Sequence, residues 1–214
     1  MSDTAAARAR SRSTVGRTTV GLVVVTAAII GTLVYQSAPS SAHAFSDVLR
    51  GDHGDTTTGA DSAATEADGA VPDGVTVFSD GYPGVANLDP ELLQALRDAA
   101  TDAAGDGIEF IVNSGWRSPR YQGQLLREAV SKYGSAAEAA RWVSTADTSA
   151  HVSGDAVDIG HMGARAWLSE HGAEYGLCQI YHNEPWHYER RPRAVGHGCP
   201  ARYADPTQDP RMRR

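Results

Sequence analysis

The stretch SAHVSGDAVD, residues Ser149–Asp158, carries a histidine and an aspartate seven positions apart. A second stretch, EPWH at Glu184–His187, adds a glutamate and another histidine. Catalytic zinc sites take three protein ligands from His, Asp or Glu and keep the fourth position for water, which a further carboxylate can deprotonate. We expect four side chains to form such a site, three as zinc ligands and the last as general base: His151, Asp158, His187 and Glu184.

The local sequence predicts how the two stretches present these groups. The Val-Ser-Gly that follows His151 is typical of a turn, and residues 155–159 are predicted to form a short strand that carries Asp158. Pro185 favours extended backbone at the residue before it, and His187 then alternates with aromatic neighbours. Each stretch thus presents a polar group from an apolar strand, which is costly unless that group has a partner.

The order and spacing of these residues resemble the D-alanyl-D-alanine carboxypeptidase family of zinc peptidases, the VanY-like group. Upstream, the stretch SGWRS at Ser114–Ser118, together with Gln122, resembles the substrate-binding segment of the same family. The resemblance covers roughly residues 75–191. It implies one zinc ion per chain on the three ligands above, and Glu184 as the catalytic glutamate. It also implies substrate contacts from three residues: Arg117, Gln122 and Ser149.

Arg117 suits the recognition of a peptide's C-terminus. A guanidinium group binds a carboxylate with two parallel hydrogen bonds, and a carboxypeptidase needs such a group. Gln122 follows five residues later, in the first turn of the next predicted helix, so both side chains can face one cleft.

The predicted fold class is α+β, a small antiparallel sheet with helices packed against it, as in the hedgehog and DD-peptidase-like fold. Asp89-Pro90 and Ser118-Pro119 are typical helix starts, with the second helix ending near Gly134. Further segments are predicted from their apolar patterns, namely strands over 108–113 and 176–182 and helices over 136–143 and 164–175.

The N-terminal part predicts a membrane-associated segment. Residues 1–17 contain four arginines against one acidic residue, and residues 18–46 contain no Asp, Glu, Lys or Arg. We expect 18–36 to be a transmembrane anchor or signal helix, with 1–17 in the cytoplasm and the rest of the chain outside the cell membrane. The Ala-His-Ala at Ala42–Ala44 fits a cleavage site, so secretion after cleavage is the alternative.

The remaining boundaries follow from composition. Residues 37–74 are mainly Ser, Ala, Gly, Asp and Thr, which predicts a flexible acidic linker. The catalytic domain is expected over 75–203. Residues 204–214 are rich in Arg, Pro and Asp and are predicted to be a disordered tail.

Two cysteines, Cys178 and Cys199, are the only ones in the chain. Because both would lie in an oxidising compartment, we expect them to form a disulfide that closes a loop around Glu184–His187. A thiolate nucleophile is the rival interpretation, but neither cysteine stands at a helix start, where thiolates are stabilised. Three other histidines are rival metal ligands: His161, His171 and His182.

The net charge of −7 argues against nucleic-acid binding, which normally needs a basic face. The resemblance implies a zinc metallopeptidase that removes the terminal D-Ala from peptidoglycan stem peptides ending in D-Ala-D-Ala, by Glu-assisted attack of metal-bound water. One alternative is a D,D-dipeptidase or a peptidoglycan endopeptidase with the same site. Another is a zinc-stabilised cell-wall binding module without turnover, against which the intact Glu184 argues.

Overall fold

The computed structural model describes residues 63–213. The predicted basic segment, the predicted membrane or signal helix over 18–36 and most of the predicted linker lie outside these residues. Within 63–213, no helix combines the length and the apolar character needed to cross a bilayer.

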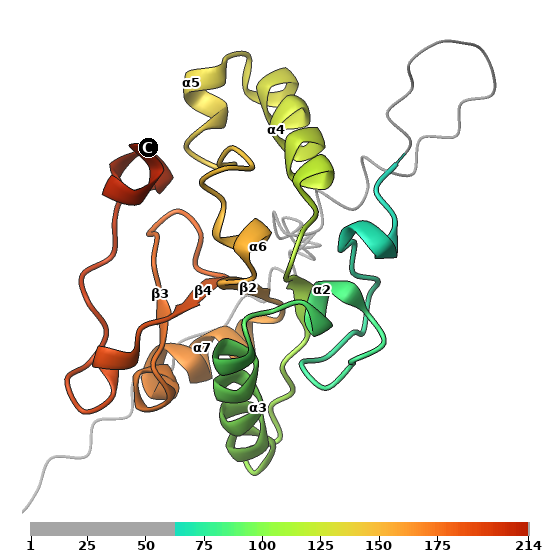
Figure 1. The fold of residues 1–214 in the computed structure, drawn as a ribbon. Helices are drawn as coiled ribbons and strands as arrows, with labels where there is room; N and C mark the ends of the chain where they lie inside the picture. The colour runs from blue at the N-terminus through green and yellow to red at the C-terminus, as the bar shows by residue number, and fades with distance from the viewer. Residues whose placement is uncertain (1–62, 214) are drawn as a thin grey trace, which may run out of the picture. The chain divides into compact units, whose positions relative to one another are not determined.

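Four short strands form one antiparallel sheet in the order β1-β2-β4-β3 (Figure 1). Their bounds are β1 Val112–Ser114, β2 Ala156–Ile159, β3 Leu177–Gln179 and β4 His187–Arg190. The prediction of a small antiparallel sheet with helices is confirmed. In the central pair of strands Asp158 lies directly opposite His187, and Ser114 of β1 lies opposite Asp158 on its other side. The register therefore gathers both predicted site stretches at one place.

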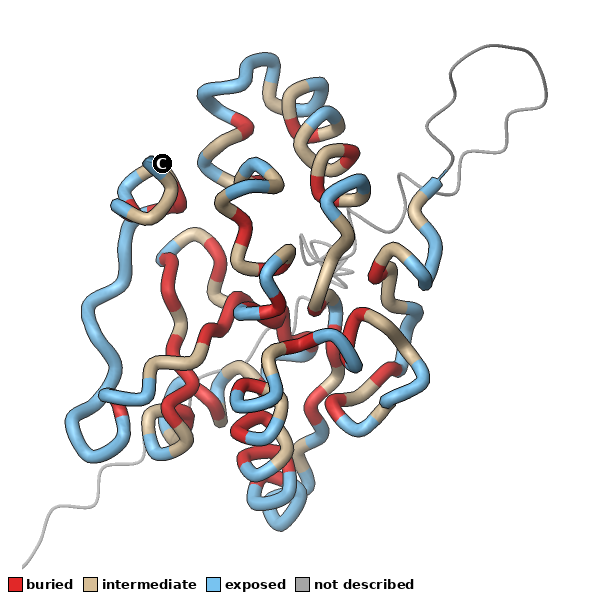
Figure 2. Tube along the Cα trace, viewed as in Figure 1, coloured by how far each residue is buried: buried red, intermediate tan, exposed pale blue. Residues whose placement is uncertain are grey.

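The main core lies between the sheet and two helices, α3 Pro90–Ala104 and α7 Met162–His171. Asp89 caps α3 by accepting hydrogen bonds from the backbone of the first turn, as its sequence predicts. Leu92 and Leu96 of α3 are fully buried against Val157 and Ile159 of β2 in this core. Figure 2 shows the burial along the strands and on one side of α3.

A second apolar cluster joins α4 Pro119–Tyr133 to α5 Ala136–Ala139, which lie side by side in Figure 1. Ser118 caps the start of α4 through its side chain, and the helix ends at Gly134 in the left-handed conformation. Both boundaries were predicted. The remaining short elements are η2 Glu66–Asp68, α2 Pro83–Ala86, α6 Ala150–Ser153, η3 Gly172–Tyr175, η4 Pro192–Ala194, η5 Pro206–Gln208 and η6 Pro210–Arg213.

Several predicted elements are shorter than the sequence suggests. The strand predicted over 108–113 pairs only at Val112–Ser114, apart from an isolated bridge between Ile111 and Thr76. The strand over 176–182 is reduced to Leu177–Gln179, and the helix over 136–143 ends at Ala139. Apolar runs continue beyond these elements because buried loops need apolar side chains as much as strands do.

The described fold extends beyond the predicted boundaries of the catalytic domain. Asp68, placed in the linker by its composition, accepts a hydrogen bond from Ser118 Oγ at 3.0 Å and pairs with Arg120. At the other end, the prediction of a disordered tail is wrong for residues 204–213, where Asp205 and Asp209 are buried. Both carboxylates have arginine partners: Asp205 pairs with Arg141 of a distant segment, and Asp209 pairs with Arg211 two residues later.

The predicted disulfide between Cys178 and Cys199 is present. It links β3 to the chain after η4 and so encloses the segment Glu184–His187. Neither cysteine is free, which excludes the rival reading of a thiolate nucleophile.

Candidate metal centre

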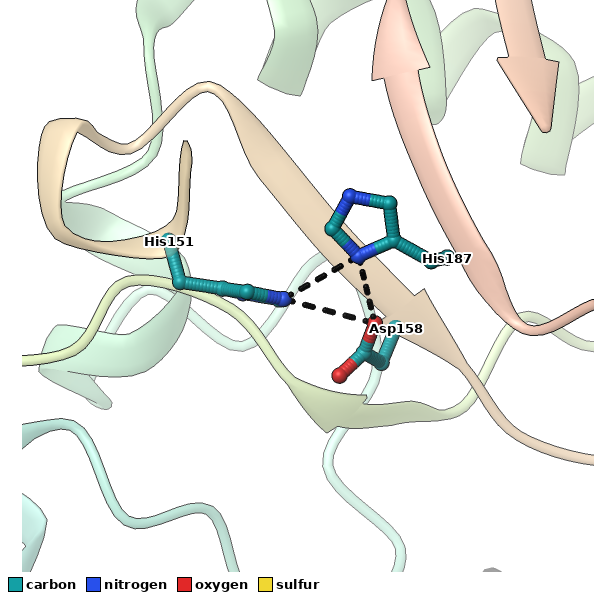
Figure 3. Close-up of side chains that lie close together, drawn as sticks. All are labelled: His151, Asp158 and His187. Carbon is teal, nitrogen blue, oxygen red and sulfur yellow. Dashed lines mark hydrogen bonds and ion pairs between the residues drawn. The ribbon is translucent and has the colours of Figure 1, made fainter. Parts of the chain in front are cut away.

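Three predicted ligands meet at one point. His151 Nε2 lies 3.2 Å from His187 Nδ1 and 3.4 Å from Asp158 Oδ1, and His187 Nδ1 lies 3.1 Å from Asp158 Oδ1. Figure 3 shows the three side chains pointing toward one another. All three residues are buried, and in residues 63–213 no other group of three His, Cys, Asp or Glu residues gathers its ligand atoms in this way.

These distances fit a zinc ion. Zinc binds histidine nitrogen and carboxylate oxygen at about 2.0–2.1 Å, so the edges of its coordination tetrahedron measure about 3.3–3.4 Å. The three observed separations, 3.1 to 3.4 Å, match those edges closely. Two imidazoles and a carboxylate are also the donor types of catalytic rather than structural zinc sites.

Local backbone features place each ligand. His151 lies in α6, a single helical turn where the sequence predicted only a turn, and Gly154 ends it with a φ of 82°. A side chain at Gly154 would also meet Asn87 O, since a Cβ there would lie 2.6 Å away. β2 then starts two residues later and delivers Asp158 next to His187 of β4.

The outer nitrogen of each imidazole has an acceptor, which fixes its tautomer. His151 Nδ1 lies 2.8 Å from the carbonyl oxygen of Gly115, and a carbonyl can only accept. His187 Nε2 lies 3.4 Å from Oε1 of Glu189, a fully buried carboxylate. With a proton on each outer nitrogen, His151 Nε2 and His187 Nδ1 are the atoms that could bind an ion at the common point.

Arg117 holds the remaining oxygen of Asp158. Its Nη2 donates to Asp158 Oδ2 at 3.0 Å, its Nε donates to Ser114 Oγ at 2.8 Å, and its Nη1 donates to Gln122 Oε1 at 3.1 Å. Gln122 is buried and donates in turn to the carbonyl oxygen of Ser144 at 2.8 Å. The sequence suggested Arg117 and Gln122 as substrate contacts. The structure shows that Gln122 contacts Arg117 and that Arg117 contacts Asp158, one of the three candidate ligands.

Ser149, the third predicted substrate contact, is the residue before α6 and is buried. Its side chain makes no capping bond to that helix. It lies two residues before His151, at the edge of the site.

The electrostatic environment separates the two carboxylates of the motif. Burial alone would raise the pKa of Asp158, but its contacts with His151 and His187 outweigh burial and hold that pKa well below its usual range. Glu184 is also buried, and burial raises its pKa to about 7. Its Oε2 lies 3.9 Å from His187 Nδ1. Glu184 thus lies beside the ligand atoms with a proton affinity suited to accepting and returning a proton near neutral pH.

The carboxylates favour positive charge at the centre of the site. Burial alone would lower the pKa of His187, but hydrogen bonds to Asp158 and Glu189 raise it to about 10. A divalent cation supplies positive charge at such a point.

The three rival histidines lie elsewhere. His161 and His182 are exposed, and His171 lies beside Glu170 and Glu174 on the surface. None of them belongs to the cluster of ligand atoms.

Sequence reasoning missed Glu189. Burial alone would raise its pKa, but hydrogen bonds from His187 and Arg211 hold that pKa well below its usual range, so the group is ionised. The signal that could have found it is its position two residues after His187 on the same strand, where both side chains face the same side.

Comparison with known proteins matches this arrangement to one family. A family model described as VanY, D-alanyl-D-alanine carboxypeptidase, matches residues 85–192, about half of the chain. The chain belongs to the VanY family. The matched region contains every predicted ligand, the general base and the three predicted substrate contacts.

Individual members resemble the chain over part of its length. The D-alanyl-D-alanine carboxypeptidase of Enterococcus faecalis is 32% identical over 126 residues, covering 47% of each protein. The chain thus spans about half the length of this VanY-family relative.

Two solved structures are similar as well. A mutant of the vancomycin-resistance D,D-pentapeptidase VanY, in complex with Zn(II), is 30% identical, with a TM-score of 0.45 over 48% of this chain and 72% of that one. The LD-carboxypeptidase LdcB is 22% identical, with a TM-score of 0.49 over 62% and 72%.

Proposed function

We propose that the chain is a zinc-dependent D,D-carboxypeptidase that removes the terminal D-alanine from peptidoglycan stem peptides. One observation carries the proposal. Three buried ligand atoms lie at tetrahedral spacing in a VanY-family domain, with an additional buried glutamate beside them.

His151 Nε2, His187 Nδ1 and Asp158 Oδ1 would hold the ion. When bound, zinc supplies a Lewis acid that polarises a carbonyl group and lowers the pKa of water. The three protein ligands leave a position for substrate or water, as in catalytic zinc sites.

Glu184 would move the proton. A carboxylate with a pKa near 7 can take a proton from water at one of its oxygens and later return it to the leaving amine. Its burial keeps bulk water from competing for that proton, and its position near His187 Nδ1 keeps it within reach of the reacting groups.

Arg117 would recognise the substrate's C-terminal carboxylate. A guanidinium group has more N–H donors than Ser114, Gln122 and Asp158 use, so donors remain for a substrate. Because the same guanidinium binds Asp158, it would fix the distance between the substrate's C-terminal carboxylate and the proposed metal ligand. Ser149, at the edge of the site, would contact the peptide.

We also propose that the domain works outside the cytoplasm, attached by the predicted helix over 18–36 or released after cleavage near Ala44. The Cys178–Cys199 disulfide supports this location, because such bonds persist mainly in oxidising compartments.

The test is release of free D-alanine from a pentapeptide stem by the full-length chain, with and without a chelator. We expect release that the chelator abolishes and zinc restores, and none from the Glu184→Gln variant. If the chain cleaves only the free dipeptide D-Ala-D-Ala, the dipeptidase is favoured. If it cleaves only cross-linked stem peptides, the endopeptidase is favoured. Zinc binding without hydrolysis of any of these would favour the binding module and contradict the proposal.

A further inference from the structure

Glu189 of β4 receives one of its two arginine partners from beyond the family-matched region. The carboxylate is 1% exposed and contacts two arginines, Arg191 and Arg211. Arg211 belongs to η6, in the segment whose composition predicted disorder, and the family match ends at residue 192.

The two arginines contact Glu189 differently. Arg191 Nη2 lies 2.6 Å from Oε2. Arg211 donates to both oxygens, from Nη1 to Oε2 at 2.7 Å and from Nη2 to Oε1 at 3.1 Å. Oε1 is the oxygen that faces His187 Nε2 at 3.4 Å, a long contact for an N–H···O bond. Arg211 thus donates a hydrogen bond to the oxygen that faces His187.

Asp209 fixes Arg211 in turn. Asp209 is completely buried, and its Oδ1 accepts from both the backbone N–H of Arg211 at 2.9 Å and its Nε at 3.1 Å. Asp209 Oδ2 accepts from the hydroxyl of Tyr181 at 3.1 Å. The ring of Tyr181 packs on the imidazole of His187, with ring centroids 5.3 Å apart. The contacts therefore form a closed circuit that starts and ends at His187.

From this circuit we propose that Arg211 is a positioning residue of the metal centre. Through Glu189 it keeps the ring of His187 in the orientation that points Nδ1 at His151 and Asp158. Carboxylates that accept from the outer nitrogen of a ligating histidine fix its tautomer and raise its basicity. The inference rests on the proposed function only in taking zinc as the ion that these ligands hold.

The alternative is that Arg211 merely anchors the C-terminal segment. In that case its loss lowers the stability of the fold and leaves the metal affinity of the folded protein unchanged. The two roles separate in a measurement of metal binding on folded, metal-free chain.

The experiment compares Arg211→Gln with Arg190→Gln in the full-length chain, using chelator competition to measure zinc affinity. Arg190 is the neighbour of Glu189 on β4 but pairs with the exposed Glu91, so its loss controls for removal of a positive charge close to Glu189. We expect Arg211→Gln to lower zinc affinity about 10- to 100-fold, the range for outer partners of metal ligands, and Arg190→Gln to change it less than about twofold. Equal affinities for Arg211→Gln and wild type would overturn the proposal.

A second readout does not depend on the ion. In crystal structures of the metal-free chain, the His187 ring should point Nδ1 at His151 and Asp158 in the wild type and lose this single orientation in Arg211→Gln. Should Arg211→Gln fail to fold, Arg211→Lys keeps the charge but loses the two-pronged contact. It is expected to lose zinc affinity less than Gln does, and unchanged affinity there would also overturn the proposal.

These outcomes are separable from failure of the proposed function. A wild-type chain that binds zinc and shows the Arg211 effect but releases no D-alanine would contradict the carboxypeptidase and leave the role of Arg211 intact. Release of D-alanine with no effect of Arg211→Gln on zinc affinity or on the orientation of His187 would support the carboxypeptidase and contradict the role of Arg211.

Discussion

Asp158 and Glu184 are carboxylates of one buried site, yet their surroundings shift their pKa values in opposite directions. Asp158, on β2, faces two imidazoles and the Arg117 guanidinium, and its pKa lies well below the usual range. Glu184, in the loop before β4, has burial as its dominant influence, and its pKa is raised to about 7. Environments that separate two carboxylates in this way assign one to permanent charge and the other to proton transfer.

The comparison predicts, first, that Glu184→Gln abolishes turnover without affecting metal binding. Gln keeps the size of the side chain but cannot accept the proton, so hydrolysis should fall about 10²- to 10⁴-fold. Zinc affinity should stay near wild type, because Glu184 is not among the clustered ligand atoms. D-alanine release and chelator competition measure the two effects, with the exposed Glu174→Gln as the control for charge. A large loss of zinc affinity would show that Glu184 is a zinc ligand and would contradict the separate roles of Asp158 and Glu184.

Asp158→Asn should have the opposite profile. The amide of Asn has no negative charge for the ion, and it places an NH₂ group near Arg117 or the imidazoles. Zinc affinity should therefore fall by more than about 100-fold, the upper range for losing a residue that only contacts a metal ligand. Asp155→Asn, an exposed neighbour on the same segment, is the control. Retained zinc affinity in Asp158→Asn would be incompatible with the assignment of Asp158 as a ligand.

The pH dependence of hydrolysis sharpens the same contrast. Glu184 must be ionised to accept a proton, so kcat/KM should rise with pH and fall about tenfold per unit below the controlling pKa. Because a nearby divalent cation lowers the pKa of a carboxylate, the midpoint should lie at or below 7. Asp158 is already ionised throughout this range and should contribute no step. A rate that decreases between about pH 5 and pH 7 would assign the proton transfer to another group.

The smallest effect on activity is expected from the disulfide. The bond between Cys178 and Cys199 encloses Glu184 but not Asp158. Replacing both cysteines with serine should lower the free energy of unfolding by about 3 kcal/mol through the entropy of the open loop. Turnover of the folded protein should change little, because sheet pairing rather than the disulfide holds His187 opposite Asp158. Denaturant titration measures the loss of stability, and D-alanine release measures turnover. A large loss of turnover in the folded variant would show that the position of Glu184 depends on the disulfide.

The site could be predicted because its determinants are local. His151 to Asp158 and Glu184 to His187 are short stretches with local backbone signals. Gly154 ends the turn after His151 as predicted, whereas Pro185 and Trp186 form a turn, closed by His187 N–H donating to Glu184 O, in place of the predicted extended alternation. The convergence of the two stretches depends on only one long-range feature, the pairing of β2 with β4. The helix caps Asp89 and Ser118 were predictable for the same reason.

The supporting residues could not be predicted because their partners are remote in sequence. Glu189 and Arg211 are polar residues separated by 22 positions, and nothing in either neighbourhood indicates the other. The C-terminal composition of Arg, Pro and Asp is typical of disorder, but here the opposite charges pair with one another and with Glu189. Arg117 was assigned to the substrate from its chemistry, while its contact with Asp158 depends on the register of β1 and β2.

The central claim is that one zinc ion is held by His151, Asp158 and His187 with Glu184 beside it. A crystal structure of the zinc-loaded chain, with anomalous data collected at the zinc absorption edge, tests it most directly. The account predicts a single peak about 2.0–2.2 Å from His151 Nε2, His187 Nδ1 and Asp158 Oδ1, with Glu184 outside bonding distance. A peak on His161, His171 or His182, or four protein ligands that include Glu184, would contradict it.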